Sequence, residues 1–197
     1  LLVLPGSRRS EVRHHMVVFG AALSRLKADG VPFEAVLPTM PHLVDAVSEG
    51  VKSWNIEPRI VVGETEKRAA FRLARAALAK SGTVTLELAL SGVPMVTAYR
   101  TGAVEAWILR RVIDVQSVIL ANLAVGENVV PEFLQDDCTA ERLALALREV
   151  LADTPLRRKQ VEAFAKLDSI MSTGGVSPSV RAADIVLATL RTDRRAS

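Results

Sequence analysis

The chain has 197 residues, of which 49% are hydrophobic and 24% are charged, as expected for a globular protein with one sizeable core. Its net charge of +3 and its aromatic content of 4% argue against a nucleic-acid partner. No apolar run approaches the roughly 18 residues of a membrane span, and no signal peptide is visible. The single cysteine, Cys138, allows no internal disulfide, which suits a cytoplasmic location, and such a cysteine is more often a packing residue than a nucleophile.

Apolar segments alternate with helical ones over the first hundred residues. We expect strands at 1–4, 33–37, 60–62, 76–79 and 95–98. We expect helices at 10–29, 41–50, 64–73, 83–90 and 103–112. Short continuous strands between helices indicate an α/β fold, a Rossmann-like parallel sheet with helices on both faces.

The pattern changes from Thr139 onward. Thr139 can cap a helix that runs to Leu151, Pro155 can open another to about Met171, and a last helix covers 176–190. Three helices without an intervening strand predict a C-terminal helical tail. The chain starts inside a strand and lacks an initial Met, so we expect it to be a piece of a longer protein.

The first strand leads directly into a polar loop and then a long helix. Gly6 lets the backbone approach a ligand, Ser7 or Ser10 can cap the helix, and Arg8 offers a planar fork of donors suited to phosphate. The alternative is that Arg8 is simply a solvated cation at a helix start.

A second junction of the same kind follows the fourth strand, at Ser81-Gly82-Thr83. Free N–H groups at a helix start attract anions. Glu87 lies one turn beyond Thr83 on the same face, a rise of roughly 6 Å, where a carboxylate could accept from sugar hydroxyls. The two junctions together predict a nucleotide or nucleotide-sugar site at the carboxyl ends of the strands. An ordinary helix cap and an exposed helical Glu are the alternatives.

Three polar residues further along the chain, Asn122, Glu132 and Gln135, each have two interpretations. Asn122 lies in an apolar stretch, where its amide needs either structural partners or a ligand. Glu132 and Gln135 follow Pro131 at an expected helix start, and could reach a nucleotide or serve only as first-turn residues.

His14 and His15 are adjacent, which is poor geometry for a metal, so we expect no metal site. Residues 104–111 suit a helix at a lipid interface and a core helix equally well.

These motifs occur in a recognisable order. Pro5-Gly6-Ser7-Arg8 with Glu11 is followed by Ser81-Gly82-Thr83 with Leu86-Glu87, Pro94-Met95-Val96 with Tyr99-Arg100, Leu120-Ala121-Asn122-Leu123, and Pro131-Glu132 with Gln135. In this order they resemble the C-terminal half of lipid-A-disaccharide synthases, glycosyltransferases of Gram-negative bacteria with two Rossmann-like domains (the GT-B fold).

The resemblance implies transfer of 2,3-diacylglucosamine from its UDP derivative to lipid X, with inversion and without a metal or cofactor. It assigns Arg8 to leaving-group stabilisation. It assigns UDP binding to Gly6, Ser7, Arg8, Ser81, Gly82, Thr83, Glu87, Asn122, Glu132 and Gln135. The acceptor site and catalytic base belong to the other half, so we expect this chain to bind UDP weakly and not to turn over.

The change of pattern at Thr139 divides the chain into a nucleotide-sugar-binding domain at 1–138 and C-terminal helices at 139–197, which pack on that domain or cross to the other half. The resemblance implies a cytoplasmic protein with peripheral contact to the inner membrane, and leaves a homodimer open. Three alternatives remain: a transferase or epimerase of the same fold that uses UDP-N-acetylglucosamine, a non-catalytic nucleotide-sugar-binding subunit, and a purely structural module.

Overall fold

The computed structural model describes residues 1–102, 117, 119–172, 175 and 177–193. The chain forms two compact units, Leu1–Leu167 and Asp168–Ser197. The first unit contains the sheet, and each unit is described below by itself.

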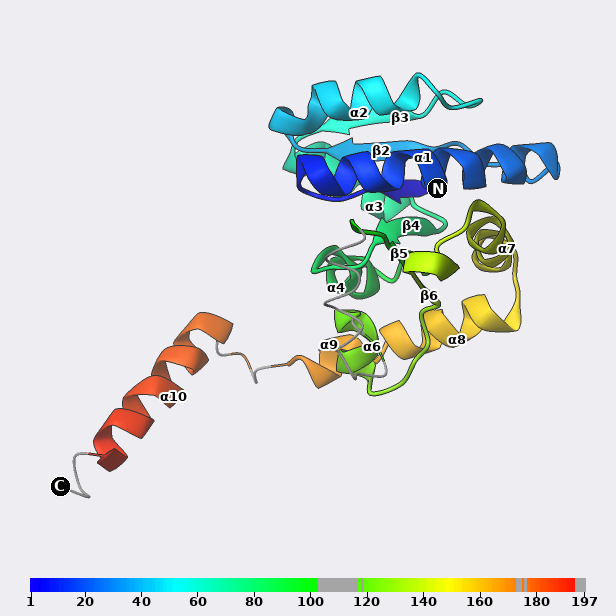
Figure 1. Ribbon diagram of the computed structural model, residues 1–197. Helices are drawn as coiled ribbons and strands as arrows, with labels where there is room; N and C mark the ends of the chain where they lie inside the picture. Colours follow the sequence, from blue (N-terminus) through cyan, green and yellow to red (C-terminus); the bar gives the residue numbers. More distant parts are fainter. Residues whose placement is uncertain (103–116, 118, 173–174, 176, 194–197) are drawn as a thin grey trace. The chain divides into compact units, whose positions relative to one another are not determined.

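A parallel sheet of six strands, in the order β3-β2-β1-β4-β5-β6, forms the centre of the first unit (Figure 1). The strands are β1 (Leu2–Leu4), β2 (Val36–Thr39), β3 (Arg59–Val62), β4 (Ala77–Lys80), β5 (Met95–Tyr99) and β6 (Glu132–Leu134). The order reverses between β1 and β4. This reversal creates a switch point, the place where open α/β sheets bind ligands beyond the carboxyl ends of the strands.

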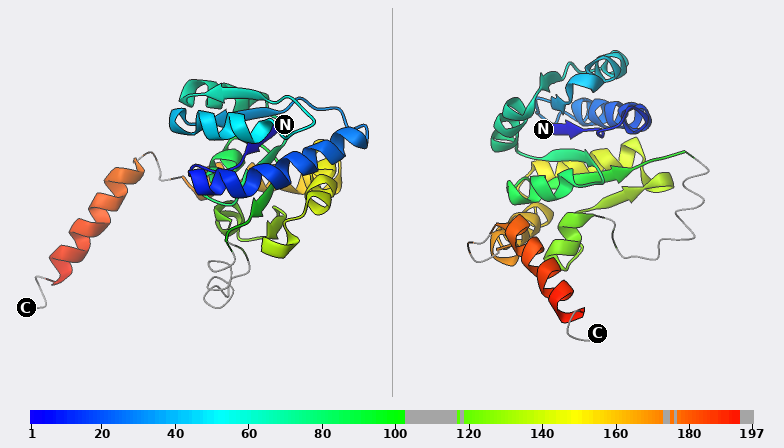
Figure 2. Two further views of the ribbon diagram at one scale, coloured as in Figure 1. Left: turned by 45° about the horizontal axis from the view of Figure 1, so that its top comes forward. Right: turned by 90° about the vertical axis from the view of Figure 1, so that its left-hand side faces the viewer.

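Helices cover both faces of this sheet (Figure 2). They are α1 (Arg9–Ala28), α2 (Val44–Val51) after a 3-10 turn η1 (Pro41–Leu43), α3 (Glu64–Leu73), α4 (Val84–Leu90), α6 (Leu120–Val125), α7 (Ala140–Leu151) after a 3-10 turn η2 (Gln135–Asp137) and α8 (Pro155–Phe164). The short helix α9 (Leu167–Ile170) begins at the last residue of the first unit.

Successive side chains along each strand point to opposite faces of the sheet, and this produces two separate hydrophobic cores. Val3 and Leu78 point into a core shared with α1, α2 and α7, whereas Leu2, Ala77 and Ala79 point into a second core shared with α3, α4 and α8. Both faces of each central strand are therefore buried, and this produces the continuous apolar runs seen in the sequence.

The α/β fold class predicted from the sequence is confirmed. All five expected strands are present, as are the helices expected at 10–29, 41–50, 64–73 and 83–90. The second strand is shifted to Val36–Thr39 and includes Pro38, which has no N–H to donate. The recorded pairing between β1 and β2 joins only Leu2 and Val36, so Pro38 interrupts no bond to β1. The helix expected at 103–112 lies outside the described residues.

Two predictions of helical structure were wrong. Glu132 begins strand β6 rather than a helix. This strand forms because it pairs in parallel with Thr97 to Tyr99 of β5, a partner that the local sequence pattern cannot reveal. The helix expected from Pro155 to about Met171 ends at Phe164, and a separate short helix begins at Leu167. Phe164 and Leu167 are both buried in the second core, so packing fixes the break.

A buried side chain replaces a backbone partner at the start of β5. Gln160 of α8 accepts from the N–H of Met95 (2.7 Å) and donates to its carbonyl (3.0 Å). These paired bonds fix α8 against the sheet. On the other face, α7 packs against α1. Helices α7 and α8 thus belong to the first unit, while the division expected at 138/139 remains a prediction.

The second unit contains helix α10 (Pro178–Asp193), which matches the last helix expected from the sequence. Its apolar side chains Val180, Ile185, Val186 and Leu187 are exposed within the described residues. Among the described helices of either unit, none combines the length and apolar character needed to cross a bilayer.

Candidate functional site

A cavity of about 360 Å³ opens beyond the carboxyl ends of β1, β2, β3 and β4. Its lining includes six of the residues singled out in the sequence, namely Gly6, Ser7, Arg8, Gly82, Thr83 and Glu87. The two junctions are brought together because β1 and β4 are adjacent strands that pair from Leu2–Ala77 to Leu4–Ala79. The site therefore lies at the switch point of the sheet.

The loop after β1 wraps around the carboxylate of Glu11. Gly6 has a φ of 134°, and a Cβ atom at this position would lie 2.5 Å from Glu11 Cβ. Glu11 Oε2 accepts from the backbone N–H of Ser7 at 2.9 Å. The expectation that Ser7 or Ser10 caps the helix was wrong. Arg8 precedes α1 without a side-chain cap, because the Glu11 carboxylate takes the loop N–H instead.

Two cations share the other oxygen of Glu11. Arg8 Nη1 lies 3.0 Å and Lys80 Nζ lies 3.2 Å from Glu11 Oε1. The Arg8 side chain is 77% exposed, whereas the Lys80 and Glu11 side chains are only 16% and 14% exposed. Burial tends to raise the pKa of Glu11, but the Ser7 N–H and Lys80 outweigh it, so this pKa lies below its usual value.

The second junction presents Glu87 to the cavity one turn after Thr83, as predicted. Lys67 of α3 lies 2.6 Å from Glu87 Oε2 and 5.5 Å from the centre of the Phe71 ring. Lys67 therefore fixes the orientation of this carboxylate at the cavity wall.

Ser81 and Glu132 form a neighbouring contact outside the cavity lining. Ser81 Oγ donates to Glu132 Oε1 at 3.4 Å, and Ser117 Oγ donates to Glu132 Oε2 at 3.2 Å. Gln135 lies beyond β6 with a φ of 48°, and its Oε1 accepts from the N–H of Thr101 at 3.4 Å. These contacts tie the segments after β4 and β5 to β6.

Asn122 occupies a structural position in the second core. Its Oδ1 accepts from the N–H groups of Val129 (3.1 Å) and Val130 (2.9 Å), and its Nδ2 donates to the Val130 carbonyl and to Ser117 Oγ. The side chain is 3% exposed. Both polar atoms are thus engaged within the protein, which favours the structural alternative over contact with a ligand.

His15 connects the first loop to the end of β5 from beneath the site. Its Nε2 accepts from the N–H of Arg100 at 3.0 Å, and its Nδ1 donates to the carbonyl of Glu11 at 2.7 Å. This pattern requires a neutral ring with its proton on Nδ1. Burial lowers the pKa of His15, and the nearby Lys80 lowers it further.

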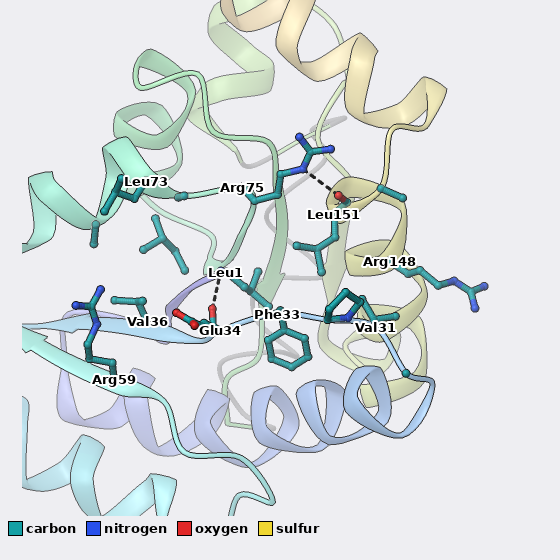
Figure 3. Close-up of a pocket in the computed structure, with 16 residues that line it drawn as sticks. Leu1, Val31, Phe33, Glu34, Val36, Arg59, Leu73, Arg75, Arg148 and Leu151 are labelled. Atoms are coloured by element: carbon teal, nitrogen blue, oxygen red, sulfur yellow. Dashed lines mark hydrogen bonds between the residues drawn. The ribbon is translucent and has the colours of Figure 1, made fainter.

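A larger cavity of about 720 Å³ lies at the opposite, amino-terminal edge of the sheet (Figure 3). Leu1, Phe33 and Val36 contribute apolar surface to it, and Arg75 crosses its rim to donate to the Leu151 carbonyl at 3.0 Å. Ligands of parallel α/β sheets bind at the carboxyl ends, so size does not make this cavity the nucleotide site.

Three residues that line the cavity have no role assigned to them from the sequence. Lys67, Lys80 and Gly63 line the cavity from α3, β4 and the end of β3. Gly63 has the strand–glycine–helix pattern that identified the other junctions and could have been found by it. Among the described residues, no group of three or more His, Cys, Asp or Glu side chains is placed to hold a metal ion.

Known proteins of one family are similar to this chain over nearly its whole length. The family model described as "Lipid-A-disaccharide synthetase" matches residues 1–183. A lipid-A-disaccharide synthase of Bradyrhizobium diazoefficiens is 72% identical over 99% of this chain and 50% of its own length. Those of Rhodopseudomonas palustris (strain BisB18) and Gluconobacter oxydans are 69% and 39% identical over 96% and 94% of this chain, and 48% and 45% of their own lengths. The chain thus spans about half the length of these curated relatives, and it belongs to the lipid-A-disaccharide synthetase family.

Proposed function

We propose that this chain is the UDP-binding half of a glycosyltransferase of lipid A biosynthesis. The observation that carries this proposal is the single cavity lined by the Gly6–Arg8 loop, the Gly82-Thr83 turn and Glu87. Family membership supports the same assignment.

In this proposal the diphosphate lies between the two loops. The backbone N–H groups of the loops and the fork of Arg8 are suitable donors for phosphate oxygens. Glu87 accepts from the ribose hydroxyls, with Lys67 holding its carboxylate 2.6 Å away. The Arg8 side chain is 77% exposed, so a bound anion can reach it.

Arg8 would also act in the reaction itself. Charge develops on the diphosphate as the bond to the sugar breaks, and a cation already aimed at it stabilises the transition state more than the ground state. The full reaction we propose is inverting transfer of 2,3-diacylglucosamine from its UDP derivative to lipid X, which gives the β-1,6 disaccharide 1-phosphate and UDP.

Ser81, Asn122, Glu132 and Gln135 have a different place in this scheme. They do not line the cavity, and the recorded contacts of their side chains are internal. We propose that they shape the floor behind the second turn, where Ser81 and Glu132 link β4 to β6, rather than contact UDP directly.

Titration calorimetry with UDP tests the binding proposal. We expect heat with UDP and none with the orthophosphate ion alone at the same concentration, because the ribose contact of Glu87 is absent. UDP at about 100 times its dissociation constant should also add roughly 2.7 kcal/mol to the free energy of unfolding. A folded chain that gives neither signal would refute this function.

A second comparison tests the donor. We expect UDP-2,3-diacylglucosamine to be preferred over UDP-N-acetylglucosamine; equal binding of the two would favour a transferase or epimerase that uses the unacylated sugar. We also expect no disaccharide from the 197-residue chain alone, because acceptor contacts and a base are assigned to the other half. Formation of product by the chain alone would contradict that division of roles.

We also propose that the whole protein contacts the inner membrane peripherally and can form a homodimer. The acylated substrates favour peripheral contact with the inner membrane, and flotation with lipid vesicles would test it. Sedimentation velocity would test for a homodimer.

A further inference from the structure

The Glu11 carboxylate lies at the centre of the polar groups that face the cavity. Three donors from two separate segments meet on this one carboxylate: the Ser7 N–H, Arg8 Nη1 and Lys80 Nζ, at 2.9, 3.0 and 3.2 Å. Two of them belong to the loop proposed to bind the diphosphate. The third, Lys80, belongs to the strand that ends at the second turn.

Lys80 is placed between the two phosphate-binding segments. It is the last residue of β4 and lines the cavity with 16% of its side chain exposed. A Cβ atom added to Gly82 would lie 3.5 Å from Lys80 Nζ, so the ammonium group is close to the second turn as well. The ammonium group also lies over the Tyr99 ring, with Nζ 5.2 Å from the ring centre.

The charges at this point are unequal. Arg8 and Lys80 bring two positive charges to one oxygen of Glu11, which supplies one negative charge. A nucleoside diphosphate carries more than one negative charge and has several oxygens, so it can satisfy both cations at once. A carboxylate with a single shared oxygen satisfies each of them less completely.

We propose that Lys80 is a diphosphate-binding residue and that the ligand's diphosphate displaces Glu11 from it. This inference rests on the proposed function, because it concerns the same cavity. Glu11 acts as an internal counter-ion while the cavity is empty, and it keeps the Ser7 N–H, Arg8 and Lys80 aimed at the place that a phosphate oxygen will take.

Calorimetry with UDP, inorganic pyrophosphate and uridine tests this inference in the 197-residue chain. Lys80→Met should weaken UDP and pyrophosphate by roughly tenfold to a hundredfold, the value of a charge-assisted hydrogen bond, and leave uridine unchanged. Lys159→Met is the matched control, because Lys159 also pairs with a carboxylate, that of Glu127, but lies outside the cavity.

Glu11→Gln tests displacement, since Gln keeps an acceptor for the Ser7 N–H and removes the charge. We expect it to bind UDP and pyrophosphate several-fold more tightly than the wild type, because the competing anion is gone. Weaker binding by Glu11→Gln would overturn displacement, and unchanged UDP and pyrophosphate binding by Lys80→Met would overturn the role of Lys80.

These titrations distinguish failure of the Lys80 role from failure of the proposed UDP-binding function. If the wild type binds UDP and Lys80→Met binds it equally well, this inference fails and the proposed function stands. If the wild type binds pyrophosphate without binding UDP, the proposed function fails and the pyrophosphate titrations still decide the role of Lys80. A wild type that binds neither refutes both.

Discussion

His15 and Arg100, 85 residues apart in the chain, are joined by a hydrogen bond of 3.0 Å from the Arg100 N–H to His15 Nε2. The His15 ring is fully buried, lies against Phe19 and Tyr99, and donates to the Glu11 carbonyl from its other nitrogen. Protonation would remove the acceptor for Arg100, so this link between α1 and the end of β5 depends on a neutral ring.

We expect the link to weaken in acid. Burial puts the folded-state pKa of His15 below its ordinary value of 6.5, so the unfolded chain gains a proton first as the pH falls. The contribution of His15 to stability is then fully present above pH 6.5 and is lost as the pH falls through the folded-state pKa. Lys80 and His14 oppose its protonation, and Glu11 favours it.

Denaturant unfolding of the wild type and His15→Gln at several pH values measures this effect. Gln retains a donor and an acceptor but does not titrate, so the difference in free energy of unfolding should shrink as the pH falls below 6.5. His42→Gln is the control, because His42 is exposed and is not among the groups that shift the pKa of His15. A difference that is independent of pH would contradict the neutral, buried ring.

Gly6→Ala should disrupt the first loop. Its φ of 134° is strained for any other residue, and the new Cβ would collide with Glu11 Cβ at 2.5 Å. We expect a loss of about 1–3 kcal/mol in the free energy of unfolding, together with weaker UDP binding. Gly30→Ala separates the two causes, because Gly30 has a positive φ of 72° but nothing within 4 Å of its added Cβ. Equal losses in both variants would show that the collision is unimportant.

Glu87→Gln should affect binding rather than folding. The Lys67–Glu87 pair is partly exposed, and pairs of this kind stabilise a fold by about 0–1 kcal/mol. UDP affinity should fall roughly tenfold, because a carboxylate that accepts from hydroxyls is lost. Glu49→Gln, which breaks the exposed pair with Lys52, is the control for both measurements. Unchanged UDP affinity in Glu87→Gln would remove Glu87 from the site.

Asn122→Ala should lower the free energy of unfolding and leave UDP affinity nearly unchanged. It leaves the N–H groups of Val129 and Val130 without their acceptor in the second core, at a cost of about 1–3 kcal/mol for each unsatisfied group. UDP affinity of the folded fraction should stay within about twofold of the wild type, whereas exposed Asn55→Ala should change neither quantity. A loss of UDP affinity without a loss of stability would show that Asn122 contacts the ligand.

Cys138 should be unreactive in the folded protein. It is 2% exposed, and burial raises its pKa to about 11, so almost no thiolate is present near neutral pH. A thiol-reactive dye should label it only in denaturant. Rapid labelling of the folded chain at neutral pH would show that the thiol is accessible and would reopen a reactive role.

Much of this site could be predicted because its signals are local. A glycine between an apolar run and a helical pattern marks a strand–turn–helix junction wherever it occurs, and this identified Gly6 and Gly82. The same reasoning failed at Glu132, because a three-residue strand such as β6 is stabilised by its neighbour β5 rather than by its own pattern.

The amino-acid sequence by itself determined the alternation of strands and helices, the two polar turns and the family, since periodicity and short motifs depend on neighbours in the chain. Only the tertiary structure decided which charges meet. Lys80 reaches Glu11, and Lys67 reaches Glu87, because strand order places β4 beside β1 and α3 beside α4's first turn. The same packing gave Asn122 its backbone partners, because an amide finds its acceptors and donors only after the core around it has closed.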